Sequence, residues 1–321
     1  MIGDETIREL LCRAWGLADG TRVARHDGGM GSQTWIVDQG ERRWVAKSVA
    51  PHLAEPFAHG LQVARLLCDA GIRAGAPVPA LSGPITVDTD SRDRVALLTW
   101  VPGSPLTGAH EDEQRLIGDT LARVHRVLRD AEVPEAQRFH WVDPAATHLG
   151  LRPWVRAAVR AAVDALTALQ RREPTWPHGL LHADPAPGAF RHDATTGHCG
   201  IIDWSSAHYG PLLYDLASAV MYLGGVRRAA AMTDAYLSAG ILTEREVADG
   251  LPVMLRFRWA VQADYFAWRI TANDLTGITG PEENEKGLED ARLALLGVGT
   301  PGQGPSTRAV IGPTIPSAVR P

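Results

Sequence analysis

Residues 180–216 read LLHADPAPGAFRHDATTGHCGIIDWSSAHYGPLLYDL, and three aspartates of this stretch have different surroundings. Asp184 lies two positions after His182 in a loop rich in Pro, Gly and Ala, Asp203 follows a short apolar run, and Asp215 opens a second one. An aspartate at the exit of a buried strand is well placed to hold a metal ion, and one in a tight loop after a histidine can take a proton from a hydroxyl. Each alone could be an ordinary turn or cap residue, so the hypothesis depends on their joint spacing.

The composition is that of an ordinary globular protein. The 321 residues suit one large domain or two smaller ones, with 45% hydrophobic and 21% charged residues. A net charge of −5 argues against a nucleic-acid binder, which would show a basic face. The three cysteines, Cys12, Cys68 and Cys199, lie far apart and form no CxxC, so neither a disulfide framework nor a zinc site is expected.

The beginning of the sequence carries no targeting pattern. Residues 1–10, MIGDETIREL, are polar and acidic and lack the basic and apolar regions of a signal peptide. No apolar run reaches transmembrane length. We therefore expect a cytoplasmic protein without a membrane partner.

A glycine-rich segment follows the first helix, which is expected over residues 6–15. Residues 25–35 read RHDGGMGSQTW, and closely spaced glycines let backbone N–H groups face an anion. No GK[ST] follows, so this is not a Walker A loop. Gly29, Gly31 and Ser32 are the candidate nucleotide contacts, and a plain hairpin turn is the alternative.

Two strands after this segment strengthen the nucleotide hypothesis. Residues 35–38 and 43–47 read as strands around a turn, and the second ends in VAK, which resembles the strand of kinases whose lysine contacts nucleotide phosphates. That lysine is Lys47, and an edge-strand lysine facing solvent is the alternative. A helix over 57–70 should then offer Lys47 a glutamate, but its inward position is expected to hold Gln62.

A hinge is expected near residue 101. Strands are expected over 84–87 and 95–100, and Val101, Pro102 and Gly103 end the second one abruptly. Backbone groups near Thr99 and Val101 could read an adenine edge there, and a simple turn is the alternative. Beyond the hinge, apolar periodicity predicts helices over 114–128, 154–169, 216–222, 227–239, 244–251 and 254–270.

The opening stretch resembles the aminoglycoside phosphotransferase family, which includes choline-kinase-like and homoserine-kinase-like enzymes. The family pattern is H-G-D-x-x-P-x-N, then I-D-W, a Gly-Pro pair and D-L-A. This chain has HADPAPGA at 182–189, IDW at 202–204, GP at 210–211 and DLA at 215–217. With the glycine-rich segment, Lys47 and the hinge, the resemblance covers roughly residues 25–270.

This resemblance implies an α+β, bilobal protein-kinase-like fold. The small antiparallel-sheet N-lobe would span 1–101 and the mainly helical C-lobe 102–296, with a flexible tail over 297–321. ATP would bind between the lobes with Mg²⁺.

The resemblance also implies a role for each side chain that matches the family pattern. Asp184 would be the base or orienting group for an acceptor hydroxyl, Asp203 would hold Mg²⁺, and Lys47 would contact phosphate. Asp215 would brace the catalytic loop through backbone N–H groups. Catalysis would then consist of positioning and charge stabilisation.

The chain departs from the family pattern in this loop. Ala189 stands where the family has a metal-binding Asn, and Ala183 replaces a glycine. A methyl group cannot coordinate Mg²⁺, which wants oxygen ligands. A water could replace the ligand, His192 or Asp193 could substitute, or phosphoryl transfer has been lost.

The functions implied are therefore of two classes. The first is an ATP-dependent kinase acting on a hydroxyl of a small molecule, an antibiotic or a metabolite, or on Ser or Thr of a peptide natural-product precursor. The second is a pseudokinase that binds nucleotide or acts as a scaffold. The Arg-rich and aromatic segment 256–269 reads as an acceptor-pocket wall or as a core helix. If Arg256, Arg258 or Arg269 faces the cleft, a neutral or anionic acceptor is favoured over a polycation.

Overall fold

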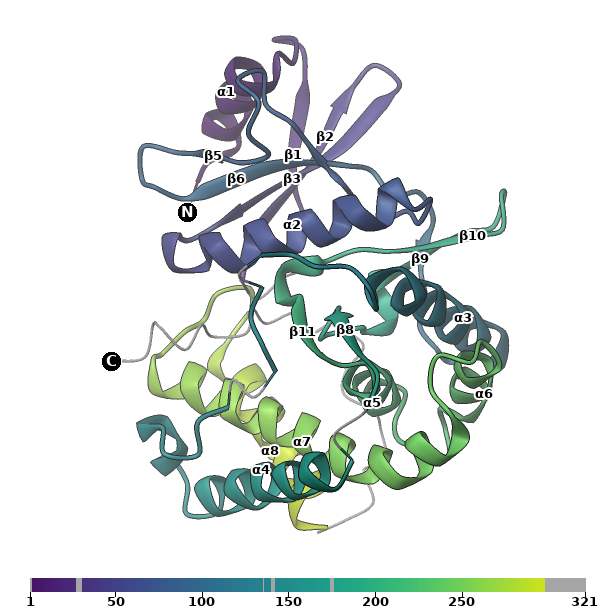
Figure 1. The fold of residues 1–321 in the computed structure, drawn as a ribbon. Helices are drawn as coiled ribbons and strands as arrows, with labels where there is room; N and C mark the ends of the chain where they lie inside the picture. The colour runs from purple at the N-terminus through teal and green to yellow at the C-terminus, as the bar shows by residue number, and fades with distance from the viewer. Residues whose placement is uncertain (1, 27–30, 135, 140–141, 174–175, 298–321) are drawn as a thin grey trace.

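The computed structural model describes residues 2–26, 31–134, 136–139, 142–173 and 176–297 and has a sheet-containing lobe above a helical lobe (Figure 1). Within these residues the upper lobe has a six-stranded antiparallel sheet, with β5 beside β6 and the remaining order β1-β2-β3-β6-β4. The α+β fold with an antiparallel-sheet N-lobe and a helical C-lobe is thereby confirmed. The strands are β1 (Arg22–His26), β2 (Gln33–Gln39), β3 (Arg42–Val49), β4 (Pro77–Val78), β5 (Val87–Asp88) and β6 (Arg94–Thr99).

Helices cover both faces of this sheet. The period-2 alternation of β3 sends Ala46 towards α1 (Asp4–Trp15) and Val49 towards α2 (Ala54–Asp69), where each joins an apolar cluster. Lys47 lies on the α2 face, and its strand is hydrogen-bonded on both sides, to β2 and to β6. The edge-strand alternative for Lys47 is therefore wrong.

Two short sheets carry the chain from the helical lobe to the aspartate loops. β8 (His178–Leu181) pairs with β11 (His208–Pro211), and β9 (Phe190–Asp193) lies between β10 (His198–Ile201) and β7 (Ser104–Pro105). Asp184 follows the end of β8 and Asp203 follows the end of β10. The strand expected before Asp203 is thus present.

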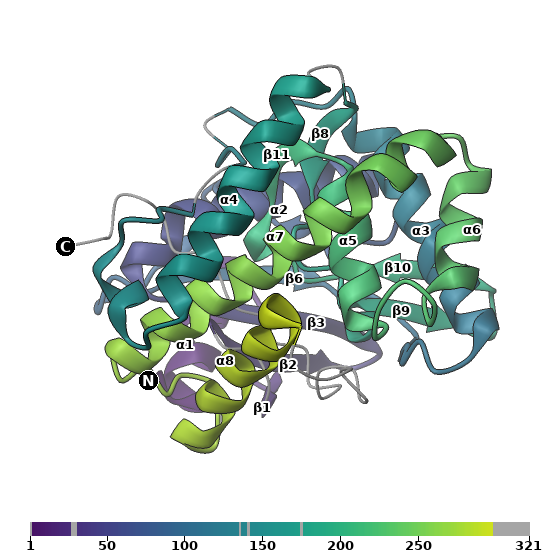
Figure 2. The same cartoon turned by 90° about the horizontal axis from the view of Figure 1, so that it is seen from below.

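The helical lobe is built on α3 (Glu111–Leu128), α4 (Val155–Arg172), α5 (Leu213–Tyr222), α6 (Ala230–Ser238), α7 (Glu244–Thr271) and α8 (Pro281–Leu296). Single 3₁₀ turns are η1 (Pro51–Leu53), η2 (Thr147–Gly150), η3 (Pro187–Ala189) and η4 (Trp204–Ser206). From below, α7 lies between α4 and α8 (Figure 2). No helix among the described residues is long and apolar enough to span a membrane.

The helix α7 corrects two sequence predictions. The segments 244–251 and 254–270 form one continuous helix with Pro252 inside it. A proline removes one intrahelical hydrogen bond, but a capping box at Thr243 and Glu246 and packing on three other helices retain the helix. Gly250 allows Trp176 to pack closely against α7, because a Cβ there would lie 2.5 Å from the Trp176 ring. The sequence had also not indicated α8.

Candidate active site

The loop that carries Asp184 is fixed by Asp215. The two carboxylate oxygens of Asp215 accept the backbone N–H groups of His182 and Ala183, each at 2.7 Å. His125 on α3 contacts the same carboxylate through Nε2 at 3.1 Å, and its other ring nitrogen contacts the Tyr236 hydroxyl at 2.7 Å. Asp215 therefore braces the loop, as expected, and His125 is a packed, hydrogen-bonded histidine.

His182 joins the two aspartate loops. Its Nε2 lies 2.9 Å from the carbonyl oxygen of Ile202, and its ring packs edge-on against Trp204, with 4.6 Å between the ring centroids. Backbone turns of positive φ redirect both loops, with φ of 67° at Ala183 and 78° at Asp203. These are conformations that non-glycine residues rarely adopt, although Asp tolerates them better than Ala.

The Asp184 carboxylate is enclosed by two helices of the C-lobe. Its Oδ1 accepts hydrogen bonds from Arg258 Nη2 on α7, at 2.9 Å, and from the Tyr222 hydroxyl at the end of α5. Burial raises the pKa of Asp184, and the charge of Arg258 offsets only part of that rise. This carboxylate can accept a proton more readily than an ordinary aspartate.

The Asp203 carboxylate is held from the other lobe. Its Oδ1 accepts from Lys47 Nζ at 2.7 Å and from Ser205 Oγ at 3.3 Å. Burial works to raise the pKa of Asp203, but the Lys47 ammonium outweighs it, and the pKa lies below the ordinary value. The carboxylate therefore stays ionised and suits a cation.

The residues around Asp203 fit a magnesium site with one protein carboxylate. Mg²⁺ is usually held by one or two carboxylates together with waters and substrate phosphates, and Asp203 supplies one. Ala189 is buried, and its carbonyl oxygen already accepts the N–H of Ile202 at 2.9 Å. In the described part of the chain, no group of three or more His, Cys, Asp or Glu side chains is arranged for a metal.

Of the two side chains that could substitute for the missing Asn ligand, Asp193 is already bound elsewhere. Asp193 accepts from Thr196 Oγ1 at 2.6 Å and Arg73 Nη1 at 3.1 Å in the β9–β10 turn, and these bonds lower its pKa to about 2. Asp193 is therefore committed to the turn. His192 lies in β9, opposite Cys199.

The candidate nucleotide contacts occupy two ends of the sheet. Gly29 lies outside the described residues, whereas Gly31 and Ser32 are half-buried immediately before β2. At the hinge, the Thr99 amide donates to the Ala76 carbonyl at 2.9 Å, so that N–H is already used. Val101 is buried against β10.

The hinge lies against the strand that leads to Asp203. A Cβ at Gly200 would come within 2.9 Å of Val101 Cγ1, so only glycine permits this approach. Arg191 lies directly opposite Gly200 and is half-buried. Burial lowers the pKa of Arg191, but the Asp203 charge opposes that effect, so a second cation contributes to the field at Asp203.

The helix α2 does not present Gln62 to Lys47. Gln62 is exposed, so the expected inward position was wrong. Gly60 instead faces η4, where a Cβ would lie 2.0 Å from the Trp204 carbonyl oxygen. The missing side chain lets α2 pack directly on the turn after Asp203, and Asp203 itself neutralises Lys47.

Sequence reasoning missed the role of Tyr222 and left that of Arg258 open. Tyr222 is seven positions after Asp215 on α5, a spacing that places both on one face of a helix. Arg258 belongs to the Arg-rich segment, but only the structure shows that it reaches Asp184. Arg269 is fully buried, and its Nε donates a hydrogen bond to Asn284 Oδ1 at 2.9 Å. Arg256 is exposed, so Arg258 is the arginine of this segment that pairs with Asp184.

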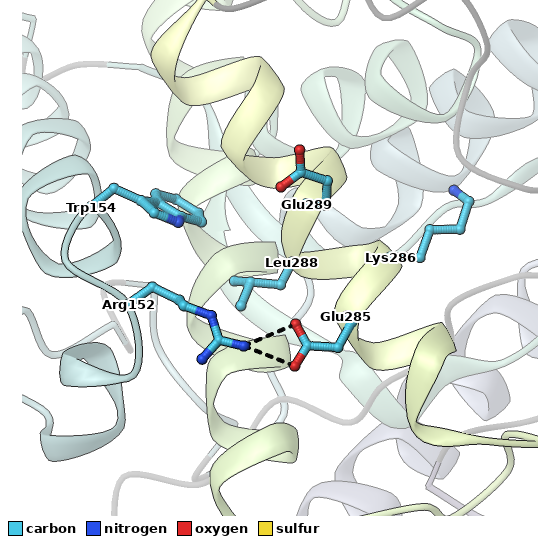
Figure 3. A pocket seen from close by; sticks show the side chains of 6 residues that line it. All are labelled: Arg152, Trp154, Glu285, Lys286, Leu288 and Glu289. Atoms are coloured by element: carbon cyan, nitrogen blue, oxygen red, sulfur yellow. Dashed lines mark hydrogen bonds and ion pairs between the residues drawn. The ribbon is translucent and has the colours of Figure 1, made fainter.

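A surface pocket lies away from the aspartate loops. It has a volume of about 320 Å³ and lies where the start of α4 faces α8. The ion pair of Arg152 with Glu285, at 3.0 Å, crosses it, and Trp154 forms a wall (Figure 3). Its lining includes none of the aspartates described above.

Together, the two lobes and the Lys47–Asp203 pair define a protein of the kinase-like class. The chain belongs to the phosphotransferase enzyme family, often abbreviated APH, whose model matches residues 22–251.

Solved structures show the same fold. A microcompartment-associated aminopropanol kinase is 21% identical, with 91% of this chain and 95% of that chain covered and a TM-score of 0.67. An amicoumacin kinase in complex with AMP-PNP and Ca²⁺ is 14% identical, with 94% and 96% covered and a TM-score of 0.70. Spectinomycin phosphotransferase in complex with ADP and spectinomycin is 14% identical, with 91% and 94% covered and a TM-score of 0.59.

Proposed function

We propose that this protein transfers the γ-phosphoryl group of ATP to a hydroxyl group of a small molecule. The observation that carries the proposal is the contrast between two aspartates whose side chains are each only 8% exposed. Asp184 has a raised pKa and is held by the C-lobe, whereas Asp203 has a lowered pKa and is paired with Lys47 of the sheet lobe. Two titratable groups whose environments push their pKa values apart are typical of a divided catalytic task.

The roles of the side chains follow from their surroundings. Asp184 orients the acceptor hydroxyl and takes its proton, while Asp203 and Lys47 bind on the phosphate side. Mg²⁺, when bound, would supply positive charge that the transferring phosphoryl group needs. Gly31, Ser32, Thr99 and Val101 would contact the nucleotide at the sheet.

The family supports this assignment, and the neighbours with bound AMP-PNP or ADP are consistent with ATP. The remaining sequence expectations belong to the same proposal: lobes over 1–101 and 102–296, a cytoplasmic location, and no nucleic-acid partner.

A pseudokinase is the second candidate, and Ala189 favours it. The test is phosphate transfer from ATP with Mg²⁺ to a panel of amino alcohols, sugars, hydroxy acids and Ser-containing peptides. Transfer by the wild type that is lost in both Asp184→Ala and Asp203→Ala supports the kinase. Nucleotide binding without transfer to any acceptor, unchanged in Ala189→Asn, would favour the pseudokinase.

A further inference from the structure

The two oxygens of the Asp184 carboxylate are not equivalent. Oδ1 accepts from both Arg258 Nη2 and the Tyr222 hydroxyl. Oδ2 is buried and has no hydrogen-bond partner among the residues that the structure describes. Asp184 is only 6% exposed, so bulk water does not supply that partner readily. One oxygen is thus held in place by protein, and the other is left for a ligand.

Arg258 shows the same asymmetry. Its Nη2 donates to Asp184 Oδ1 at 2.9 Å and to the Tyr222 hydroxyl at 3.2 Å. Its Nε is buried and, within the described ranges, has no hydrogen-bond partner, and the side chain is only 8% exposed. An unmade hydrogen bond on a buried charged group is costly, so folded proteins rarely leave one without a reason. Here a donor and an acceptor without partners occur on the two members of one ion pair.

The charges nearby disfavour a cationic ligand. Asp274 pairs with Arg269 at 3.3 Å, and Asp264 contacts His148 at 2.7 Å, so these two carboxylates, on and just after the helix α7 that carries Arg258, already have partners. Asp184 itself is shared with Arg258. A polycation would meet the Arg258 guanidinium with no further unpaired carboxylate from Asp264 or Asp274 to balance it. An anion would meet a guanidinium whose Nε is available.

We propose that the acceptor is a small hydroxy acid, with a carboxylate a few bonds from the reacting hydroxyl. The inference rests on the proposed function, because it names the substrate class of that same site. The hydroxyl donates to Asp184 Oδ2, and a carboxylate oxygen accepts from Arg258 Nε. In the reaction, the acceptor oxygen forms a bond to the γ-phosphorus, its proton passes to Asp184, and the bond to the β-phosphate oxygen breaks as ADP leaves.

Three probes with one carbon frame test the substrate class: glycerate, glycerol and 3-aminopropane-1,2-diol. They differ in a terminal carboxylate, hydroxyl or ammonium group. Saturation-transfer NMR with AMP-PNP and Mg²⁺ measures binding, and ADP release with ATP measures transfer. We expect glycerate to be preferred over glycerol by at least about tenfold in affinity and the aminodiol to be weakest, the size given by one charge-assisted hydrogen bond.

Variants of one helix attribute the preference to the guanidinium. Arg258→Leu should abolish the preference for glycerate, Arg258→Lys should retain part of it, and Arg256→Leu, at an exposed position of α7, should leave it unchanged. Unaltered AMP-PNP affinity shows that each variant is folded.

The outcomes separate the inference from the proposed function. Arg258-dependent binding of glycerate without transfer to any probe would sustain the substrate class and contradict the kinase. Transfer with equal use of all three probes, or preference for the aminodiol, would sustain the kinase and overturn the substrate class. Glycerate binding that is unchanged by Arg258→Leu would also overturn the substrate class. The ion pair would then be structural, with the guanidinium hydrogen-bonded to both oxygens of Asp184.

Discussion

Asp184 and Asp203 differ less in burial than in the partners that hold them. Each lies in a loop just beyond a short strand, and each makes one ion pair, at 2.9 Å and 2.7 Å. The pKa of Asp184 is raised because burial outweighs Arg258, and that of Asp203 is lowered because Lys47 outweighs burial. Environment, and not residue type, thus pushes the two pKa values apart, which is what the proposed division between proton transfer and cation binding requires.

The partners also come from different parts of the molecule. Arg258 and Tyr222 belong to helices α7 and α5 of the lobe that carries Asp184, whereas Lys47 belongs to the sheet of the other lobe. A relative movement of the lobes would therefore change the surroundings of Asp203 and leave those of Asp184 intact.

The largest expected effect comes from removing either charge. Asp184→Asn and Asp203→Asn should each lower kcat by roughly 10²–10⁴-fold, the usual contribution of a positioned base or of charge stabilisation. Only Asp203→Asn should also weaken binding of the nucleotide with Mg²⁺, because only Asp203 is proposed to bind on the phosphate side. Calorimetric titration with MgAMP-PNP measures this, and equal loss of nucleotide affinity in both variants would contradict the division of roles.

The next effect concerns the contact that fixes the Asp203 turn. Gly60→Ala places a Cβ 2.0 Å from the Trp204 carbonyl oxygen, so α2 or η4 must shift. Overpacking of this kind costs about 1–3 kcal/mol of unfolding free energy. We expect the lost stability in urea unfolding to accompany weaker MgAMP-PNP binding.

Gly188→Ala is the matched control for this substitution. Gly188 lies in η3 of the Asp184 loop and has nothing within 4 Å of an added Cβ. It should unfold within about 0.5 kcal/mol of the wild type, as surface substitutions usually do. A stability for Gly60→Ala equal to that of Gly188→Ala would show that α2 does not need this close approach.

The sequence predicted the site residues that belong to short motifs better than the contacts that depend on how helices pack. Asp203, Lys47 and the bracing Asp215 were assigned from short patterns, and the structure places Lys47 beside Asp203 and Asp215 beneath the loop. The bond of Arg258 to Asp184 depends on how α7 crosses the loop, which no local pattern records.

Helix rotation and helix continuity explain the other failures. Gln62 was expected to face Lys47, but two positions along a helix correspond to a rotation of about 200°, and the structure turns Gly60 inward instead. Pro252 suggested a break that tertiary packing overrides. Both errors arise because local propensity is a weak guide once a helix is buried on several sides.

The pH dependence of phosphoryl transfer tests the role proposed for Asp184. Asp184 must be ionised to accept a proton, so its raised pKa predicts that kcat falls on acidification at a higher pH than for an ordinary aspartate. Arg258 lowers this pKa, so Arg258→Leu should move the acidic limb to still higher pH. The other groups that act on Asp184, Tyr222 and His182, remain in the variant.

A pH–rate profile of Arg258→Leu beside Arg256→Leu measures the shift. Arg256 is exposed on the same helix, and its loss should leave the acidic limb where it is in the wild type. An acidic limb of Arg258→Leu that coincides with the wild type would assign the limb to a group other than Asp184.

The smallest expected effect concerns the two non-glycine residues of positive φ in the aspartate loops. Asp203 is a residue type that tolerates the left-handed region, but Ala183 is not, and its φ of 67° costs free energy that a glycine would not lose. Ala183→Gly should therefore stabilise the protein by roughly 0.5–1 kcal/mol, less than the strain itself because glycine also loosens the unfolded chain. Ala186→Gly, in the same loop at φ −67°, should destabilise it instead. Urea unfolding of both variants checks the opposite signs, and a destabilised Ala183→Gly would mean that packing of the buried Ala183 methyl group, and not backbone strain, dominates.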